Sequence, residues 1–261
     1  MVGIIIGACP REKRIDYNGW RLLNSIGEEI GVVVENIRLY DNLRQAYLST
    51  IRALAEAIDA RDSYTKGHSD NVSSLAVAIG RQMGLEEEMI VDLRDAGYLH
   101  DVGKIGTPDT VLMKEGVLTN DEMETMRLHP GTSHKILAEA HLTDGVKEMI
   151  RHHHERYDGT GYPDGLAGED IPIGSRILAV ADAYEAMVSD RPYRSRLKDD
   201  EALSELKHCS GGQFDPQVVE AFIKAIKEWE MEEGDGVKAA TEGSAPQDGK
   251  NRIIDNGRHA S

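Results

Sequence analysis

The sequence predicts an all-α protein, in which a long N-terminal linker helix leads into a helical bundle and a disordered C-terminal tail follows. Two observations predict this fold class. Between about residues 49 and 230 nearly every segment repeats its apolar residues with the period of a helix, and strand-like alternation is absent. After Trp229 the chain becomes a mixture of Gly, Ser, Asp and Lys that cannot bury enough surface to become ordered. We therefore expect three parts, covering residues 1–45, 46–230 and 231–261.

The N-terminal part predicts a short strand over Val2–Ile6 and an amphipathic helix that begins near Tyr17. From Gly31 a longer helix is predicted, because apolar or aromatic residues follow alternating steps of four and three, with Arg44 as the one break. Such a pattern suits a parallel coiled coil, so a homodimer through the linker helix is expected. Packing of the half after Tyr47 along its own domain fits the same residues. The spaced residues are Val33, Ile37, Tyr40, Tyr47, Ile51, Leu54 and Ile58.

The bundle itself is predicted to consist of eight further helices. The last of them has the clearest boundary, since Asp215-Pro216 supplies an N-cap and a first-turn proline after the Gly211-Gly212 stop. The eight segments are Val72–Met83, Glu86–Leu99, Asp121–Leu128, Gly131–Ala140, Asp144–His153, Arg176–Val188, Asp199–Cys209 and Pro216–Trp229.

Composition excludes several classes of function. The formal net charge of −16 argues against attraction to polymeric nucleic acid or to anionic lipid. The apolar run Ile4–Ile6 is too short for a membrane span or a signal sequence, so a cytoplasmic protein is expected. With only Cys9 and Cys209, no disulfide framework or thiolate metal site is expected.

Histidine and aspartate residues between His68 and Asp182 predict the chemistry. Each lies at the edge of its own predicted helix, and His100-Asp101 closes an apolar helix, where exposed polar residues would be unexpected. Imidazole and carboxylate ligands without cysteine suit iron, manganese or zinc, and a shared carboxylate lets two ions polarise one phosphoryl group. A metal-dependent phosphohydrolase is therefore predicted. The residues are His68, His100, Asp101, His129, His153, His154 and Asp182.

Several motifs resemble those of the HD-GYP domain, a branch of the HD phosphohydrolases, over roughly residues 50–228. The resemblance implies an HD-type helical bundle that hydrolyses cyclic di-GMP to pGpG, GMP or both with two or three metal ions, commonly iron or manganese. The motifs are Lys66–Ser69, His100–Lys104, His153–Pro163, Ala181–Met187, Asp190–Arg194 and Gly212–Pro216.

Residue by residue, the resemblance implies that Asp101 bridges two ions. His68, His100 and Asp182 would complete the first ligand set, and His129, His153 and His154 the second. Asp101 and Lys104 are the expected catalytic residues: a bridging water or hydroxide would attack phosphorus while Lys104 contacts the scissile phosphate. The general acid is unassigned. The expected substrate-binding residues are Lys104, Tyr162, Arg191 and Arg194.

Three positions depart from the family pattern or add to it. Tyr64 stands where some members have a glutamate that holds a third metal, so a two-metal centre is expected. Asn71 stands where relatives usually have an arginine, whose loss would alter local packing if that arginine normally pairs with a carboxylate. His152 precedes the two expected ligands and is interpreted as an exposed residue or as one that supports them.

Residues 1–45 resemble the C-terminal end of a GAF sensory domain and its exit helix, which implies a fragment of a longer signalling protein. Two alternatives to a cyclic di-GMP phosphodiesterase stay open. One is a weakly catalytic cyclic di-GMP receptor, for which Asn71 and Tyr64 leave room. The other is an HD-type hydrolase of a different nucleotide.

Overall fold

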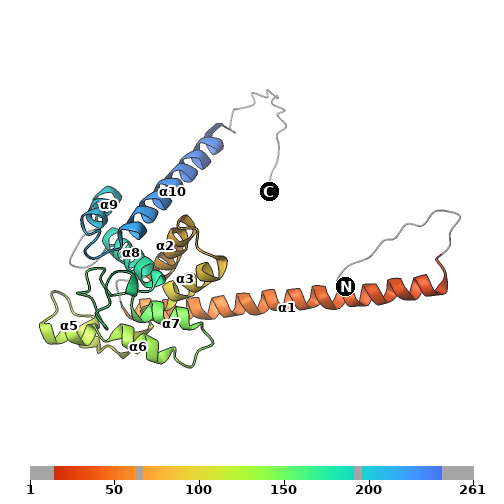
Figure 1. Cartoon of the computed structure of the whole chain (residues 1–261), viewed down its shortest axis with the longest axis horizontal. Coiled ribbons are helices and arrows are strands. Elements are labelled where there is room, and N and C mark those ends of the chain that lie inside the picture. Colours follow the sequence, from red (N-terminus) through yellow and green to blue (C-terminus); the bar gives the residue numbers. More distant parts are fainter. Residues whose placement is uncertain (1–14, 63–66, 191–195, 243–261) are drawn as a thin grey trace, which may run out of the picture.

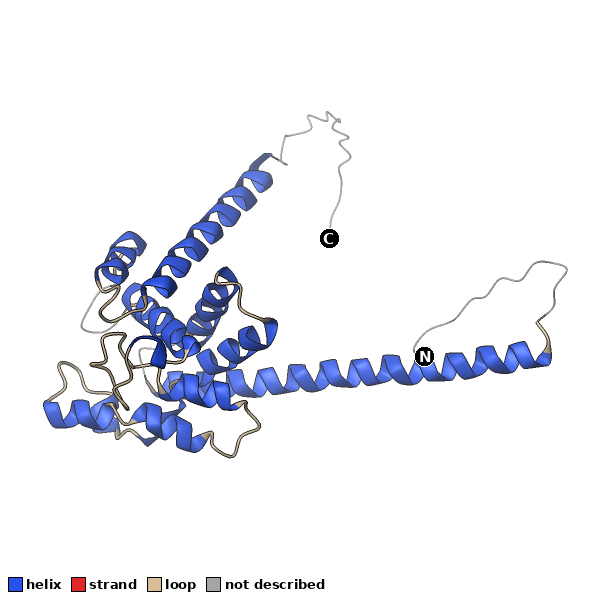
Figure 2. Cartoon of the chain, viewed as in Figure 1, coloured by secondary structure: helices blue, strands red, loops and turns tan. Residues whose placement is uncertain are grey.

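The computed structural model describes residues 15–62, 67–190 and 196–242, with side chains up to residue 229. Helices and connecting loops make up this part of the chain, and no strand is found in it (Figure 2). The predicted all-α fold class is confirmed. The strand expected over Val2–Ile6 and the arginines Arg191 and Arg194 lie outside the described residues.

Helix α1 (Tyr17–Arg61) begins where the sequence predicts and runs without a break through Gly31. Asp16 caps it by accepting a 2.7 Å hydrogen bond from the Gly19 amide. The helix extends far from the bundle (Figure 1), and only its last turns, which include Ile51 and Ile58, are buried against the domain. For these residues the structure therefore shows packing within the domain rather than a free coiled-coil face.

The predicted helices are all present, with shifted ends. The sequence did not predict the short helices η1 (Val102–Gly106), α4 (Asp109–Leu112) and η2 (Gly168–Asp170). The others are α2 (His68–Gln82), α3 (Glu87–Leu99), α5 (Asn120–Met126), α6 (His129–Ile136), α7 (Asp144–Arg151), α8 (Ile173–Val188), α9 (Asp199–His208) and α10 (Pro216–Glu242).

The core lies where α2, α3 and α8 meet, with α7, α9 and α10 packed around them (Figure 1). Ile79, Leu93 and Ile177 are fully buried there, so burial of apolar faces fixes the relative positions of the three central helices. Gly103 brings η1 against α6: a Cβ atom at this position would lie 2.1 Å from the His129 carbonyl oxygen. This close approach places the His100-Asp101 segment beside the start of α6.

Helix α10 continues to Glu242, beyond the predicted end at Trp229. Its first turns pack Val218 and Phe222 into the core. The following residues are rich in Glu, Lys and Ala, which favour helix, so the helix extends past the last buried turn. The part of the predicted disordered tail up to residue 242 is therefore helical. None of the described helices combines the length and apolar character needed to span a membrane.

Candidate metal centre

The structure brings together the side chains that the sequence singled out. His68 is the first residue of α2, His100 follows α3, and His129 opens α6. His153 and His154 follow α7, while Asp182 lies on α8. The histidines lie at helix ends and Asp182 lies inside α8, and the packing of the helices brings these positions together. His68, His100, Asp101, His129 and His153 are buried.

Asp101 lies between two groups of histidines. Its Oδ2 atom is 3.4 Å from His100 Nε2 and 3.8 Å from His68 Nε2, whereas its Oδ1 atom is 3.2 Å from His129 Nε2. Asp182 Oδ1 is 3.4 Å from His68 Nε2. We call His68, His100 and Asp182 the first ligand set, and His129, His153 and His154 the second. One carboxylate therefore offers a separate oxygen to each set.

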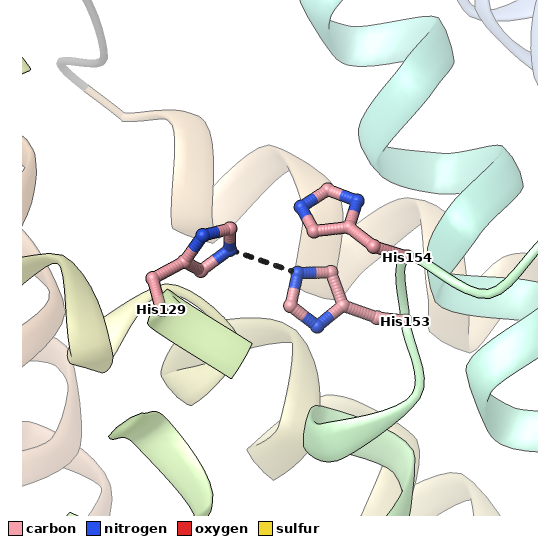
Figure 3. A group of neighbouring side chains, drawn as sticks. All are labelled: His129, His153 and His154. Carbon is pink, nitrogen blue, oxygen red and sulfur yellow. Dashed lines mark hydrogen bonds between the residues drawn. The ribbon is translucent and has the colours of Figure 1, made fainter. Parts of the chain in front are cut away.

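The second ligand set consists only of imidazoles. Figure 3 shows His129 facing His153 and His154, and the Nε2 atoms of His129 and His153 are 3.4 Å apart. The ring centroids of His153 and His154 are 4.1 Å apart. The ligand atoms of the three residues lie close enough to hold one ion.

Outer hydrogen bonds fix which nitrogen each histidine presents. The Nδ1 atoms of His100, His129 and His153 lie 2.6–2.8 Å from backbone carbonyl oxygens, which only accept hydrogen bonds. Nδ1 of His68 instead faces the Glu185 carboxylate at 2.5 Å. With the proton on Nδ1, each ring directs its Nε2 lone pair into the centre, as in carboxylate-histidine-metal arrangements.

The donor geometry fits divalent metal ions. His68 and His100 place their Nε2 atoms 3.3 Å apart, and both are tied through Nδ1 to acceptors. Two lone pairs that face each other at this distance repel unless a cation lies near both, which is the proton of His68 in the metal-free protein and a metal ion once one is bound. Nitrogen and carboxylate donors of this kind suit first-row divalent metals.

The two ligand sets differ in charge. Burial and the neighbouring His129 lower the pKa of His154 to about 3, so this ring is neutral at physiological pH. Burial and His154 also hold the pKa of His153 well below its ordinary value. Burial disfavours protonated His68 as well, but its hydrogen bond to Glu185 and nearby Asp182 outweigh this effect and raise its pKa to about 9.

Lys104 lies on the side of the first set. Its Nζ is 2.7 Å from Asp101 Oδ2 and 3.0 Å from Asp62 Oδ2. Burial opposes the charge of Lys104, but the two carboxylates outweigh burial and raise its pKa above the ordinary value. Burial likewise opposes ionisation of Asp101, but Lys104 and the surrounding histidines hold the pKa of this carboxyl well below its usual range.

Tyr162 lies on the side of the second set, with its ring centroid 5.0 Å from that of His154. A Cβ at Gly161 would lie 2.3 Å from the Arg156 amide nitrogen, so only glycine lets the loop approach this closely. The Arg127 guanidinium lies over the Tyr162 ring, 5.5 Å from the ring centroid. Burial and the negative charge of Asp182 raise the pKa of Tyr162 to about 12, so the phenol keeps its proton.

Sequence reasoning missed three of these residues. Asp62 and Arg127 carry no motif of their own, and only the folded chain places them at the centre. Glu185 lies inside a recognised motif, three residues after Asp182, a spacing that puts both side chains on one face of a helix. This spacing was the available indication.

The two residues with open interpretations are now placed. Asn71 Nδ2 donates to Glu185 Oε1 at 3.3 Å, so the asparagine itself pairs with a carboxylate. His152 is buried, not exposed, and its Nε2 lies 2.8 Å from Asp164 Oδ2. It does not belong to either ligand set. Tyr64 lies outside the described residues.

Comparisons with known proteins agree with this geometry. A family model described as an HD domain matches residues 52–218. A relative from Xanthomonas campestris, named cyclic di-GMP phosphodiesterase response regulator RpfG, is 42% identical over 185 residues, covering 70% of this chain and 49% of the relative. A Thermotoga maritima protein named cyclic di-GMP phosphodiesterase is 40% identical over 191 residues, covering 72% and 51%. A Vibrio cholerae protein named 3'3'-cGAMP-specific phosphodiesterase 2 is 35% identical over 206 residues, covering 78% and 40%.

The chain thus spans about half the length, or less, of these curated relatives. Among solved structures, a cyclic GMP-AMP specific phosphodiesterase of V. cholerae superposes with a TM-score of 0.56 at 23% identity, covering 68% of this chain and 48% of that one. This likeness concerns the fold. Together with the match of the family model and the positions of the His-Asp and Gly-Tyr-Pro motifs, it shows that the chain belongs to the HD domain family, in its HD-GYP branch.

Proposed function

We propose that this domain is a metal-dependent phosphodiesterase that hydrolyses cyclic di-GMP to pGpG, GMP or both. The observation that carries the proposal is Asp101, whose two oxygens face two separate ligand sets. A shared carboxylate with histidines on each side is the arrangement that two ions need to act on one phosphate. The names of the Xanthomonas and Thermotoga relatives support the choice of substrate.

The proposed cofactors are two divalent ions, iron or manganese. Asp101 would contribute to both sites, His68, His100 and Asp182 to one, and His129, His153 and His154 to the other. Bound divalent ions lower the pKa of water toward neutrality and offset negative charge on a phosphoryl group.

The remaining residues act on the substrate. Lys104 keeps its positive charge at all relevant pH values, so it is suited to bind the scissile phosphate and to stabilise the charge that develops on it. Tyr162, a neutral phenol beside His154, is suited to lie against a base or ribose. Arg191 and Arg194 are proposed to meet phosphate or guanine, although they lie outside the described residues.

A second candidate substrate is a cyclic GMP-AMP dinucleotide. Relatives named 3'3'-cGAMP-specific phosphodiesterases are 34–35% identical to this chain. Their names favour a test of both cyclic dinucleotides rather than one. The metal centre treats the phosphates of the two compounds alike, so the contacts to the second base decide between them.

We also propose that the protein is cytoplasmic and forms a homodimer. The linker helix supports the homodimer. Seven apolar or aromatic residues of α1 follow alternating steps of three and four, with Arg44 as the one break, and all of them are exposed in one chain. Leu23, Ile26 and Ile30 extend the predicted coiled-coil pattern toward the N-terminus. A second copy of α1 would bury the whole stripe. Sedimentation analysis at tens of micromolar should show a dimer, and a Val33→Ser/Ile37→Ser variant should be monomeric; a monomeric parent chain would overturn the proposal. The stripe consists of Leu23, Ile26, Ile30, Val33, Ile37, Tyr40 and Tyr47.

The activity is tested by anaerobic incubation of the purified chain, with iron or manganese supplied and metal content measured, against cyclic di-GMP and 3'3'-cGAMP. Chromatography should show metal-dependent pGpG or GMP. Tight binding of uncleaved cyclic di-GMP would instead support a receptor. Faster cleavage of 3'3'-cGAMP would move the assignment to the second substrate.

A further inference from the structure

A cavity outside the metal centre is lined by residues of helices α1, α2, α3 and α10. Figure 1 shows the arrangement of these helices. The volume of the cavity is about 500 Å³, and none of the seven residues of the metal centre lines it. Small-molecule sites in proteins are cavities of about 300–1,000 Å³. The cavity is therefore large enough for a ligand of nucleotide size.

Three arginines, Arg52, Arg81 and Arg94, line this cavity, together with one acidic residue, Glu228. Carboxylates balance two of these guanidinium groups, because Arg52 Nε lies 3.6 Å from Asp70 Oδ1 and Arg94 pairs with Asp95. Among the described residues Arg81 has no carboxylate partner, so its positive charge is the one that an anion meets in this highly acidic protein.

The three guanidinium groups are not equally engaged. Arg52 Nε donates to the Tyr98 hydroxyl at 2.8 Å, and Arg94 forms a 2.8 Å ion pair with Asp95. Arg81 is exposed, and within the described part of the chain its guanidinium forms no ion pair or side-chain hydrogen bond. Arg81 is therefore free to bind an anion, while its two neighbours are held in place around it.

Aromatic and hydroxyl groups complete the lining. Trp229 is 42% exposed, so a large part of its indole ring is open to a ligand. Ser73, Ser74 and Gln82 add hydrogen-bonding groups. An aromatic side chain that stacks on a base and guanidinium groups that bind phosphate are the two elements by which proteins hold nucleotides.

We propose that this cavity is a second ligand site that binds a nucleoside phosphate. The base stacks on Trp229, and the phosphate lies against Arg81 and Arg94. A ligand here touches α2, which begins at His68, and α3, which leads into His100. It also contacts α1 through Arg52, so the site joins the linker helix to α2 and α3, which position His68 and His100.

Trp229 provides a direct test, because the chain has only two tryptophans. In a Trp20→Phe variant of the full, metal-loaded chain, all tryptophan fluorescence comes from Trp229. ATP, GTP, inorganic pyrophosphate and guanosine are titrated separately and the fluorescence is recorded. The same titrations are made after adding Arg81→Gln and, as a matched control, Arg38→Gln, which removes an exposed arginine of α1 outside the cavity.

The expected result is a saturable change with ATP or GTP whose apparent Kd rises about tenfold with Arg81→Gln and stays the same with Arg38→Gln. No response to either nucleotide would overturn the proposal. So would an equal response in the Arg81→Gln variant, which would place the nucleotide elsewhere, or pyrophosphate binding as tightly as GTP, which would leave the base without a role. Since the readout requires no hydrolysis, it stands apart from the test of the phosphodiesterase.

Discussion

The two ligand sets on either side of Asp101 are built from different chemical groups. The first combines histidines with the carboxylate of Asp182, and Glu185 contacts His68 from outside the set. The two carboxylates hold a proton on His68, whose pKa is raised to about 9. The second contains only imidazoles, and burial keeps His154 neutral with a pKa lowered to about 3. One shared centre thus contains a half in which His68 is protonated without metal and a half in which His153 and His154 are already neutral.

Because the two ligand sets differ in this way, we expect metal ions to bind them with unequal affinity. A metal ligand must offer a free lone pair, so binding at the first set displaces the proton of His68 below about pH 9, whereas His153 and His154 of the second set are already neutral. We expect the second set to fill first as metal is added at neutral pH, and the first set to gain affinity as pH rises.

Asp101→Asn should break both halves at once. The change removes the charge that serves both ligand sets and the ion pair with Lys104, so hydrolysis should fall by about 10³-fold or more and bound metal should drop. Metal analysis and product chromatography measure the two effects. Asp121→Asn, which changes an exposed aspartate of α5, is the matched control. Full metal content with full activity in the Asp101 variant would refute the shared role of this carboxylate.

Lys104→Gln should spare the metals and slow the reaction. Lys104 contacts Asp101 through Oδ2 and supplies positive charge without occupying a ligand position. We expect metal content near that of the parent and kcat lower by about 10²-fold. Lys224→Gln on α10 serves as the control. A variant that turns over at the parent rate would remove Lys104 from the mechanism.

Glu185→Gln should separate the two halves. The carboxylate orients His68 alone, so metal affinity should fall about 10- to 100-fold at the first set and remain unchanged at the second. Metal titration should then show one strong and one weakened step. Glu205→Gln on α9 is the control for loss of a glutamate. Equal weakening of both steps would show that Glu185 acts on the whole centre instead.

The metal-free protein should be most stable near pH 6.5. Between pH 6.5 and 9 native His68 holds a proton that the unfolded chain lacks, so stability falls as pH rises. Between pH 6.5 and 3 the unfolded chain protonates the histidine that native His154 keeps neutral, so stability falls as pH drops, by up to about 1.4 kcal/mol per pH unit for this one group. Urea unfolding across this range measures both slopes. His154→Gln should flatten the acidic slope and leave the alkaline one, and an unchanged acidic slope would count against a neutral His154.

Arg127→Ala should have the smallest effect. This arginine lies over Tyr162 on the side of the second set. Among the described residues it forms no hydrogen bond or ion pair with a residue of either set. If the substrate base binds there, KM should rise about three- to tenfold with kcat nearly constant. Arg38→Ala on the linker helix is the control. A lower kcat at unchanged KM would indicate that Arg127 acts on the chemical step.

The sequence by itself determined the helical class and the identity of the seven residues that meet at the metal centre. Helical periodicity is local, so eight bundle helices could be predicted from the spacing of apolar residues, with the histidines near helix ends and Asp182 inside its helix. The ends of helices were less certain, because packing extends α2 back to His68 and helix propensity carries α10 to Glu242. The predicted phosphate-binding role of Arg191 and Arg194 stays a prediction, because residues 191–195 lie outside the described part of the chain.

The orientation, the partners and the protonation of the side chains at this centre depend on the tertiary structure. Which oxygen of Asp101 faces which histidines depends on η1 lying against α6 at Gly103, a contact between segments about 30 residues apart. The roles of Glu185, Asp62 and Arg127 arise in the same way, since their partners lie on other helices or on a distant loop. Local spacing identifies groups able to bind metal, whereas their protonation and orientation depend on burial and on neighbours that the fold brings together.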